Sequence, residues 1–167
     1  AGTGSFYPIH EPFRAILKES LGAQKLSNGA LNVFVGRQVA LWRQARKLQQ
    51  MPDVLALAQI AQKIQGNCVE FSADSTQIRL VDSACQLDLG SIGKGFVAQR
   101  VMEELKLFGF PFTLVDAGGK LAMTSQGPTE SAWQVAVEIP VSNALLSEVL
   151  ALKNVSVATS GKTYQSI

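Results

Sequence analysis

Residues 87–96, with the sequence LDLGSIGKGF, carry the strongest structural signal in this chain. The apolar residues around Asp88 predict a short strand, and the apolar spacing after Gly95 predicts an amphipathic helix. Between the two lies a glycine-rich turn with one carboxylate and one lysine. A turn of this kind at a helix N-terminus presents backbone N–H groups to an anion, most often a phosphate. The segment therefore predicts an anion-binding turn between a strand and a helix.

Two further glycine turns follow apolar segments. They have the sequences DAGG at residues 116–119 and ATSG at residues 158–161. Three such turns after predicted strands indicate that one nucleotide-like ligand contacts all of them.

The glycine spacing excludes the two commonest phosphate loops. In a P-loop, Asp88 would have to be the first glycine and Gly95 the metal-binding hydroxyl residue. A dinucleotide-binding loop requires GxGxxG, and glycines at positions 90, 93 and 95 do not match it.

The polar residues of the 87–96 turn indicate specific contacts. Asp88 can accept hydrogen bonds from a sugar hydroxyl or a ring N–H. Ser91 offers a hydroxyl and a carbonyl oxygen, which are the hard ligands that Mg²⁺ or Ca²⁺ prefers. Lys94 adds positive charge where a phosphate would lie. The alternative is that Asp88 and Ser91 only cap the helix, but capping explains neither Lys94 nor the glycines.

Composition indicates one domain with a sizeable core, because the chain has 167 residues and is 47% hydrophobic. The formal net charge is only +2, and the one basic cluster, at Arg43, Arg46 and Lys47, is interpreted as a solvated helix face rather than a nucleic-acid surface. No apolar run approaches the roughly 18 residues that span a bilayer. We expect the chain to be part of a longer product that has further N- and C-terminal portions.

The cysteines, the histidine and the tryptophans are interpreted as structural residues rather than as catalytic or metal-binding ones. Cys68 and Cys85 are favoured as two small core residues, with a disulfide across adjacent strands as the alternative in an oxidising compartment. Neither forms a CxxC motif, and a single histidine gives them no zinc partners. His10 is predicted to be a surface or capping residue, and Trp42 and Trp133 are predicted to lie in the core.

The apolar spacing predicts mainly helices first and mixed strands later, which favours the α+β class. The first predicted helix runs from Phe13 to the loop at residues 27–29, and Asn32 is predicted to be the N-cap of a second helix. A third is predicted from Pro52 and Asp53 to Gly66. Two more are predicted at residues 97–108 and 144–153. Strands are predicted near residues 69–71, 78–80, 112–115, 121–123, 133–137 and 155–158.

These segments resemble, in order, the signature segments of the FAD:protein FMN transferases, the ApbE family. Residues 88–99 resemble DLGGIAKGYAVD, residues 114–119 resemble LVNAGGD, and residues 133–137 resemble WRVGI. Residues 158–161 resemble ATSGD, and residues 27–32 with Leu41-Trp42 resemble SGGAFDPTVGPLVNLW. The resemblance covers residues 9–165. It implies one flavin-transferase domain over residues 1–167, with a mixed, largely antiparallel sheet and flanking helices.

The resemblance also implies a function. Members of the family bind FAD, use Mg²⁺, transfer FMN to a threonine hydroxyl of a partner protein and release AMP, on the periplasmic or outer face of the inner membrane. A membrane tether would lie outside this chain. By position, the residues expected to contact FAD are Ala30, Leu31, Asn32, Asp88 and Lys94, and the expected metal ligand is Ser91.

Four departures from the family pattern keep other functions open. Asn32 stands where the family usually has Asp, Lys120 and Lys162 stand at two other acids, and Asp116 stands at an Asn. The family's H-x-x-DP-x-TG region, which supplies an Asp and a Thr as metal ligands, has no counterpart in these residues. The alternatives are a non-catalytic FAD-binding module and a pyrophosphatase that hydrolyses FAD to FMN and AMP.

Overall fold

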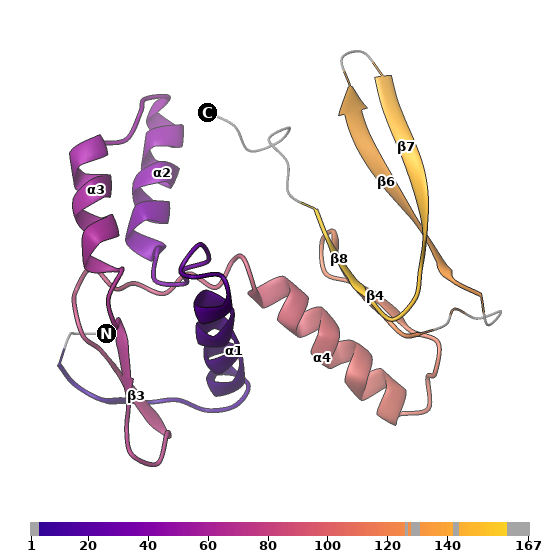
Figure 1. Cartoon of the computed structure of the whole chain (residues 1–167), viewed down its shortest axis with the longest axis horizontal. Coiled ribbons are helices and arrows are strands. Elements are labelled where there is room, and N and C mark those ends of the chain that lie inside the picture. Colours follow the sequence, from indigo (N-terminus) through magenta and orange to yellow (C-terminus); the bar gives the residue numbers. More distant parts are fainter. Residues whose placement is uncertain (1–3, 126, 128–130, 142–143, 160–167) are drawn as a thin grey trace. The chain divides into compact units, whose positions relative to one another are not determined.

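The computed structural model describes residues 4–125, 127, 131–141 and 144–159 (Figure 1). The chain divides into two compact units, one built from residues up to Ile92 and the other from Gly93 onward. Helices and antiparallel strands are mixed among the described residues, which confirms the predicted α+β class. No helix of the described part has the length and apolarity to cross a membrane.

The first unit combines three helices with a small antiparallel sheet of order β1-β3-β2. Its helices are α1 (Phe13–Leu26), α2 (Gly36–Leu48) and α3 (Val54–Lys63), and its strands are β1 (Tyr7–Pro8), β2 (Val69–Phe71) and β3 (Gln77–Leu80). The core beneath them includes the fully buried Leu17, Val33 and Phe34. The predicted start of α3 is confirmed, because the Asp53 carboxylate accepts hydrogen bonds from the N–H groups of Leu55 and Ala56.

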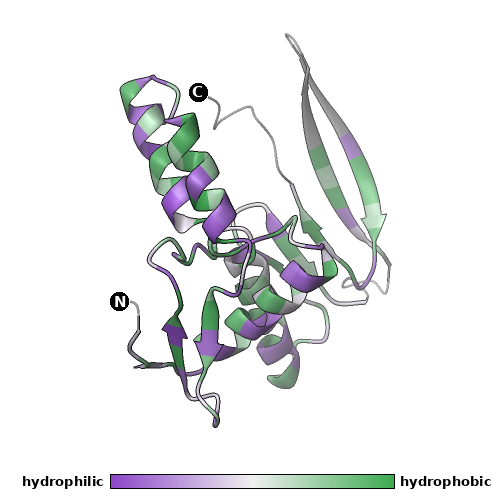
Figure 2. Ribbon diagram, turned by 60° about the vertical axis from the view of Figure 1, so that its left-hand side comes forward, coloured by the Kyte–Doolittle hydropathy of each residue, from purple (hydrophilic) through white to green (hydrophobic). Residues whose placement is uncertain are grey.

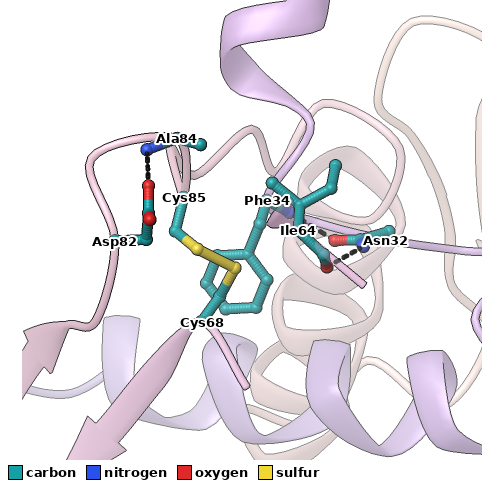
Figure 3. Close-up of a disulfide and its surroundings, with 7 residues drawn as sticks. All are labelled: Asn32, Phe34, Ile64, Cys68, Asp82, Ala84 and Cys85. Atoms are coloured by element: carbon teal, nitrogen blue, oxygen red, sulfur yellow. Dashed lines mark hydrogen bonds between the residues drawn. A yellow bond between two sulfur atoms is a disulfide. The ribbon is translucent and has the colours of Figure 1, made fainter. Parts of the chain in front are cut away.

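A disulfide between Cys68 and Cys85 lies in this core (Figure 3). Both residues are almost completely buried, at 1% and 2% exposure. Cys68 directly precedes β2, and Cys85 follows β3, so the bridge closes the segment that contains both strands. The favoured interpretation of Cys68 and Cys85 as two unpaired core residues is therefore wrong, and the alternative, a disulfide between them, is present.

The second unit packs helix α4 (Gly93–Leu107) on a three-stranded antiparallel sheet of order β4-β5-β8. The strands are β4 (Leu114–Asp116), β5 (Lys120–Met123) and β8 (Ser156–Ala158). Ala98 and Met102 of α4 and Ala122 of β5 form the buried contact. Strands β6 (Trp133–Val141) and β7 (Ala144–Leu152) form a separate antiparallel pair (Figure 1).

The predicted helix at residues 144–153 is wrong, since β7 occupies this segment. Alanine, leucine and glutamate favour helices, which explains the error. The backbone of β7 instead pairs with β6 along its whole length, from Trp133 opposite Leu152 to Val141 opposite Ala144. Tertiary pairing of this kind overrides intrinsic preference.

Two smaller predictions are also wrong. Asn32 does not cap the second helix, because α2 begins at Gly36 with Val35 as its N-cap. Trp42 does not lie in the core, since it is 41% exposed on α2. Figure 2 shows that both apolar and polar residues lie along the helices of the first unit.

Candidate functional site

Backbone pairing holds residues 86–88, at the start of the glycine-rich turn, against residues 33–36. The Gly36 N–H donates to the Gln86 carbonyl at 2.8 Å, and the Asp88 N–H donates to the Val33 carbonyl at 2.8 Å. Val35 and Gln86 form an isolated parallel bridge. The strand predicted before the turn is therefore reduced to a single bridge, because the chain turns at Asp88. This pairing brings together two segments that lie about fifty residues apart in the sequence.

Gly36 permits this close approach. A Cβ atom added to Gly36 would lie 2.7 Å from the Gln86 carbonyl oxygen and 2.8 Å from the Gln86 Cγ. Real Cβ atoms do not approach other atoms so closely, so a side chain at this position would push the two segments apart.

The Asp88 carboxylate makes its contacts within the first unit and shapes the start of the turn. Its Oδ1 atom accepts a hydrogen bond from the Gly90 N–H at 2.8 Å, and its Oδ2 atom lies 3.6 Å from the Arg43 guanidinium. The side chain is only 20% exposed. Asp88 therefore fixes the backbone that leads to Ser91, which is itself exposed.

A groove of about 550 Å³ opens beside this turn within the first unit. Its volume falls in the range of roughly 300–1,000 Å³ that is typical of small-molecule sites. Four of the six predicted site residues line it, namely Ala30, Leu31, Asn32 and Ser91. Asp88 does not line the groove, but it is bonded to Val33, which directly follows the Ala30–Asn32 triplet.

The Asn32 side chain belongs to one wall of the groove, and Figure 3 shows its two hydrogen bonds. Its Oδ1 atom accepts a hydrogen bond from the Phe34 N–H at 2.8 Å, and its Nδ2 atom donates to the Ile64 carbonyl at 3.0 Å. The amide thus connects the triplet to the C-terminal end of α3. A carboxylate could not donate to Ile64, so this bond requires the Asn that the sequence has in place of the family's Asp.

Lys94 belongs to the second unit, where it lies in the first turn of α4. Its Nζ atom is 3.5 Å from the point where a Gly118 side chain would begin. Gly118 and Gly119 both have positive φ angles, of 67° and 77°, which favour glycine. The Asp116 carboxylate stabilises this turn by accepting a hydrogen bond from the Gly119 N–H at 2.7 Å.

The second and third glycine turns meet in the same unit. Strand β5 pairs with β8, so Lys120 lies opposite Ala158. The Lys120 ammonium donates to the Thr159 carbonyl, and Thr159 Oγ1 lies 3.8 Å from where a Gly119 side chain would begin. Lys94, Lys120 and the two glycines thus form a cationic corner with accessible backbone, which suits an anion. Residues 160–162 of the third turn lie outside the described residues.

The described residues do not complete a metal site. Within the described ranges, no three His, Cys, Asp or Glu side chains lie close enough to hold one metal ion. Ser91 offers a single oxygen ligand, which is too few for Mg²⁺ held by protein.

Two glutamines of the groove were missed by the sequence analysis. Gln38 from α2 and Gln65 after α3 line the groove and supply amide donors and acceptors. Neither belongs to a motif, so only the packing of α2 and α3 reveals them.

Comparison with protein families gives a match along the whole chain. The model of the ApbE family matches residues 1–167. Two curated relatives are named FAD:protein FMN transferase. The protein from Haemophilus influenzae is 28% identical over 159 residues, which cover 92% of this chain and 46% of that protein. The protein from Treponema pallidum is 29% identical over 161 residues, which cover 88% and 44%.

Solved structures show the same fold. The flavinyl transferase ApbE of Pseudomonas stutzeri, in its apo form, aligns with a TM-score of 0.77 at 23% identity over 96% of this chain and 50% of that one. The ApbE protein of Thermotoga maritima aligns with a TM-score of 0.78 at 22% identity over 96% and 52%. These likenesses confirm the expected flavin-transferase fold. The chain spans about half the length of the relatives and structures it matches.

Proposed function

The chain belongs to the ApbE family, and from that membership we propose that it acts in the transfer of FMN from FAD to a threonine or serine hydroxyl of a partner protein, with release of AMP. The observation that carries the proposal is the groove in which Ala30, Leu31, Asn32 and Ser91 lie together. These residues come from two distant segments that a parallel backbone pairing joins.

In this proposal the groove binds an uncharged part of FAD. Its walls combine apolar side chains with the amides of Gln38 and Gln65, a mixture that suits a heteroaromatic ring or a sugar. Asp88 acts as a positioning residue, because its carboxylate is occupied by the Gly90 N–H and faces Arg43.

Lys94 and the glycine turn that begins at Asp116 are proposed to contact the pyrophosphate of FAD. The Lys94 ammonium lies next to Gly118, where no side chain blocks an approaching anion. A fixed cation near the reacting phosphate stabilises the charge that develops as the pyrophosphate bond breaks.

The chemistry is a phosphoryl-group substitution. The hydroxyl oxygen of the acceptor forms a bond to the phosphorus of the FMN half. The bond from this phosphorus to the bridging oxygen breaks, AMP leaves with that oxygen, and the hydroxyl proton passes to solvent. Positioning and charge stabilisation supply most of the rate enhancement in reactions of this kind.

The proposed activity depends on Mg²⁺ or Ca²⁺, and Ser91 is the one residue of this chain that we propose as a ligand of the metal ion. A bound metal ion would neutralise charge on the pyrophosphate. The described residues do not fit a complete metal site, so we derive no step through the metal.

Action in an oxidising compartment, such as the periplasm, is also proposed. The buried Cys68–Cys85 disulfide supports it, because structural disulfides persist in such compartments. A membrane tether would lie outside this chain.

A non-catalytic FAD-binding module is the second candidate. Two positions where the family has acids carry residues that are used structurally here. The Asn32 amide bonds to Phe34 and Ile64, and the Lys120 ammonium bonds to Thr159. Hydrolysis of FAD to FMN and AMP is the third candidate, and it differs from transfer only in that water is the nucleophile.

Calorimetric titration of the full chain with FAD, with and without Mg²⁺, tests the proposal first. FAD binding that Mg²⁺ strengthens, followed by FMN attachment to an acceptor peptide with stoichiometric AMP, supports transfer. AMP without attachment indicates hydrolysis, and binding without AMP indicates the binding module. Lys94→Ala should weaken FAD binding about tenfold, a loss comparable to that of one charged hydrogen bond. Lys106→Ala, at the other end of α4, is the matched control.

A further inference from the structure

The tip of the α2–α3 hairpin exposes four large apolar side chains. We use the name hairpin tip for residues 48–55. Its exposed residues are Leu48 at 58%, Met51 at 71%, Val54 at 69% and Leu55 at 75%. Figure 1 shows that α2 and α3 lie side by side and are joined here, at the end away from β3. Four such side chains within eight residues far exceed the scattered exposure that is normal on a surface.

The backbone of the hairpin tip is fixed by its own hydrogen bonds. Gln49 adopts a left-handed conformation, with a φ of 51°, and the Gln50 N–H donates to the Ala45 carbonyl at 3.0 Å. Asp53 caps α3 at its Oδ1 atom, with distances of 2.8 and 3.2 Å to two N–H groups, and Pro52 is buried. The turn therefore holds its apolar side chains outward instead of folding them onto the helices.

Positive charge surrounds the hairpin tip. Arg43, Arg46 and Lys47 follow the i, i+3, i+4 spacing of one helix face in the last turns of α2, and all three are exposed. Residues 36–63 contain five basic residues and one acidic residue, Asp53, whereas the whole chain has a net charge of only +2. The single carboxylate of this segment caps α3, and Arg43 also faces Asp88, so Arg46 and Lys47 are the basic residues next to the tip and the hairpin as a whole carries a net positive charge.

We propose that the hairpin tip docks on an anionic lipid surface. Protruding apolar side chains enter the boundary between headgroups and acyl chains, and the Lys and Arg side chains behind them lie at the level of the charged headgroups. This combination of a rigid apolar tip with a cationic collar is the charge and shape complement of an anionic bilayer. The inference does not depend on FAD binding or on transfer.

Sedimentation of the full chain with vesicles tests this inference. We expect the chain to bind vesicles that contain phosphatidylglycerol, and to bind pure phosphatidylcholine vesicles at least tenfold more weakly. Met51→Glu and Leu55→Glu should each reduce binding about tenfold or more. Arg46→Gln and Lys47→Gln should each reduce it about fivefold, as expected for one cation near an anionic surface.

The matched controls lie elsewhere on the chain. Leu26→Glu changes an apolar side chain at the end of α1 that is 89% exposed, and Lys18→Gln removes an exposed charge from α1. Both variants should bind as the parent does. All variants replace exposed side chains, and circular dichroism confirms that they fold. Absence of vesicle binding, binding by Met51→Glu that equals binding by the parent, or a loss in Leu26→Glu as large as that in Met51→Glu overturns the proposal. The first of these outcomes would leave a protein surface as the occupant of the tip.

Discussion

A single amide, that of Asn32, joins two backbone segments of the groove, residues 32–34 and the end of α3. It accepts from Phe34 and donates to Ile64 at the end of α3, so both of its polar atoms are used. An ordinary hydrogen bond contributes about 1 kcal/mol net, but a buried or half-buried acceptor that loses its donor costs roughly 1–3 kcal/mol. A change at residue 32 would therefore alter the stability of the groove wall as well as the charge of the groove.

Asn32→Asp should lower the free energy of unfolding at neutral pH by roughly 1–3 kcal/mol, because a carboxylate would face the Ile64 carbonyl oxygen. The Phe34 N–H bond would favour the ionised carboxyl, but we expect the facing carbonyl oxygen and the partial burial to outweigh it and to raise the pKa above the unfolded value of about 3.9. The loss is therefore absent below that unfolded pKa, where the protonated carboxyl can donate, and it grows as the pH rises from the unfolded pKa through the raised folded pKa.

Urea unfolding from pH 3 to pH 7 measures this effect. Asn32→Ala is the control, since it removes the amide without adding a charge, and its stability relative to the parent should not depend on pH. A stability difference for Asn32→Asp that is constant with pH would contradict the assigned hydrogen bond.

Gly36→Ala should destabilise the first unit by roughly 1–3 kcal/mol, as overpacking in a tight contact does. Its Cβ would lie 2.7 Å from the Gln86 carbonyl oxygen, so the pairing that forms the groove would open. Gly22→Ala is the matched control, because Gly22 lies inside α1 with no atom within 4 Å of an added Cβ. That control should gain about 0.5–1 kcal/mol from helix propensity. Thermal unfolding of both variants measures the contrast, and equal losses would refute the argument.

At the level of elements, the disulfide stabilises the β2–β3 segment. It joins Cys68 and Cys85, which are 17 residues apart, and the bridge is buried in the core. Closing a loop of this length stabilises the folded state by about 3 kcal/mol, mainly by restricting the unfolded chain. Removal of the bridge with the double change Cys68→Ala and Cys85→Ala should therefore lower the free energy of unfolding by about that amount.

Urea unfolding with and without a reductant measures the contribution of the disulfide. The reductant should destabilise the parent chain and leave the double variant unchanged. Equal stability of the reduced and oxidised parent would show that the bridge does not constrain the unfolded state.

The turn between β2 and β3 predicts a second, pH-dependent contribution. Hydrogen bonds from the Ser72 hydroxyl, and then from the N–H and hydroxyl of Thr76, lower the pKa of Asp74 to about 2. Because the folded pKa is lower than the unfolded value of 3.8, this stabilisation is present above pH 3.8 and is lost as the pH falls toward 2.

Asp74→Asn should flatten the acid limb of the stability curve between pH 4 and pH 2, without a change in shape at neutral pH. Unfolding measured across that range provides the comparison with the parent. Asp53→Asn is the control, because it replaces a carboxylate of another turn, the N-cap of α3, and leaves the Asp74 turn unchanged.

For the whole molecule, the proposed FAD contacts fall in both units. Each unit contains one tryptophan, Trp42 in the first and Trp133 in the second, so the unfolding of each can be followed separately. Trp133→Phe leaves Trp42 as the reporter, and Trp42→Phe leaves Trp133. A ligand at one hundred times its Kd stabilises the state that binds it by about 2.7 kcal/mol.

FAD should therefore raise the unfolding midpoint reported by both tryptophans. Fluorescence-detected urea unfolding with saturating FAD measures the two shifts, and AMP is the control ligand, because it lacks the flavin half. A shift reported by Trp42 alone would limit FAD binding to the groove, and the proposed role of Lys94 would then be abandoned.

Local patterns in the sequence were enough to predict the order of most helices and strands, the α+β class, the start of α3 near Asp53 and the family. Apolar periodicity, capping residues and glycine turns act over a few residues, so their effects can be predicted from short segments. The same locality explains the errors at residues 144–153, Asn32 and Trp42. Residues 144–153 form a strand because β7 pairs with β6. Asn32 bonds to Ile64 instead of capping a helix, and Trp42 lies on an exposed face of α2.

Contacts between residues far apart in the sequence determined the features that the sequence analysis did not predict. The Cys68–Cys85 bridge, the pairing of Gly36 with Gln86 and the groove with its two glutamines join residues from 17 to about sixty positions apart. No periodicity in the sequence encodes such pairs, because they form only when the whole core is packed. The sequence thus supplied the chemical groups of the candidate site, and tertiary packing selected which of them line one groove.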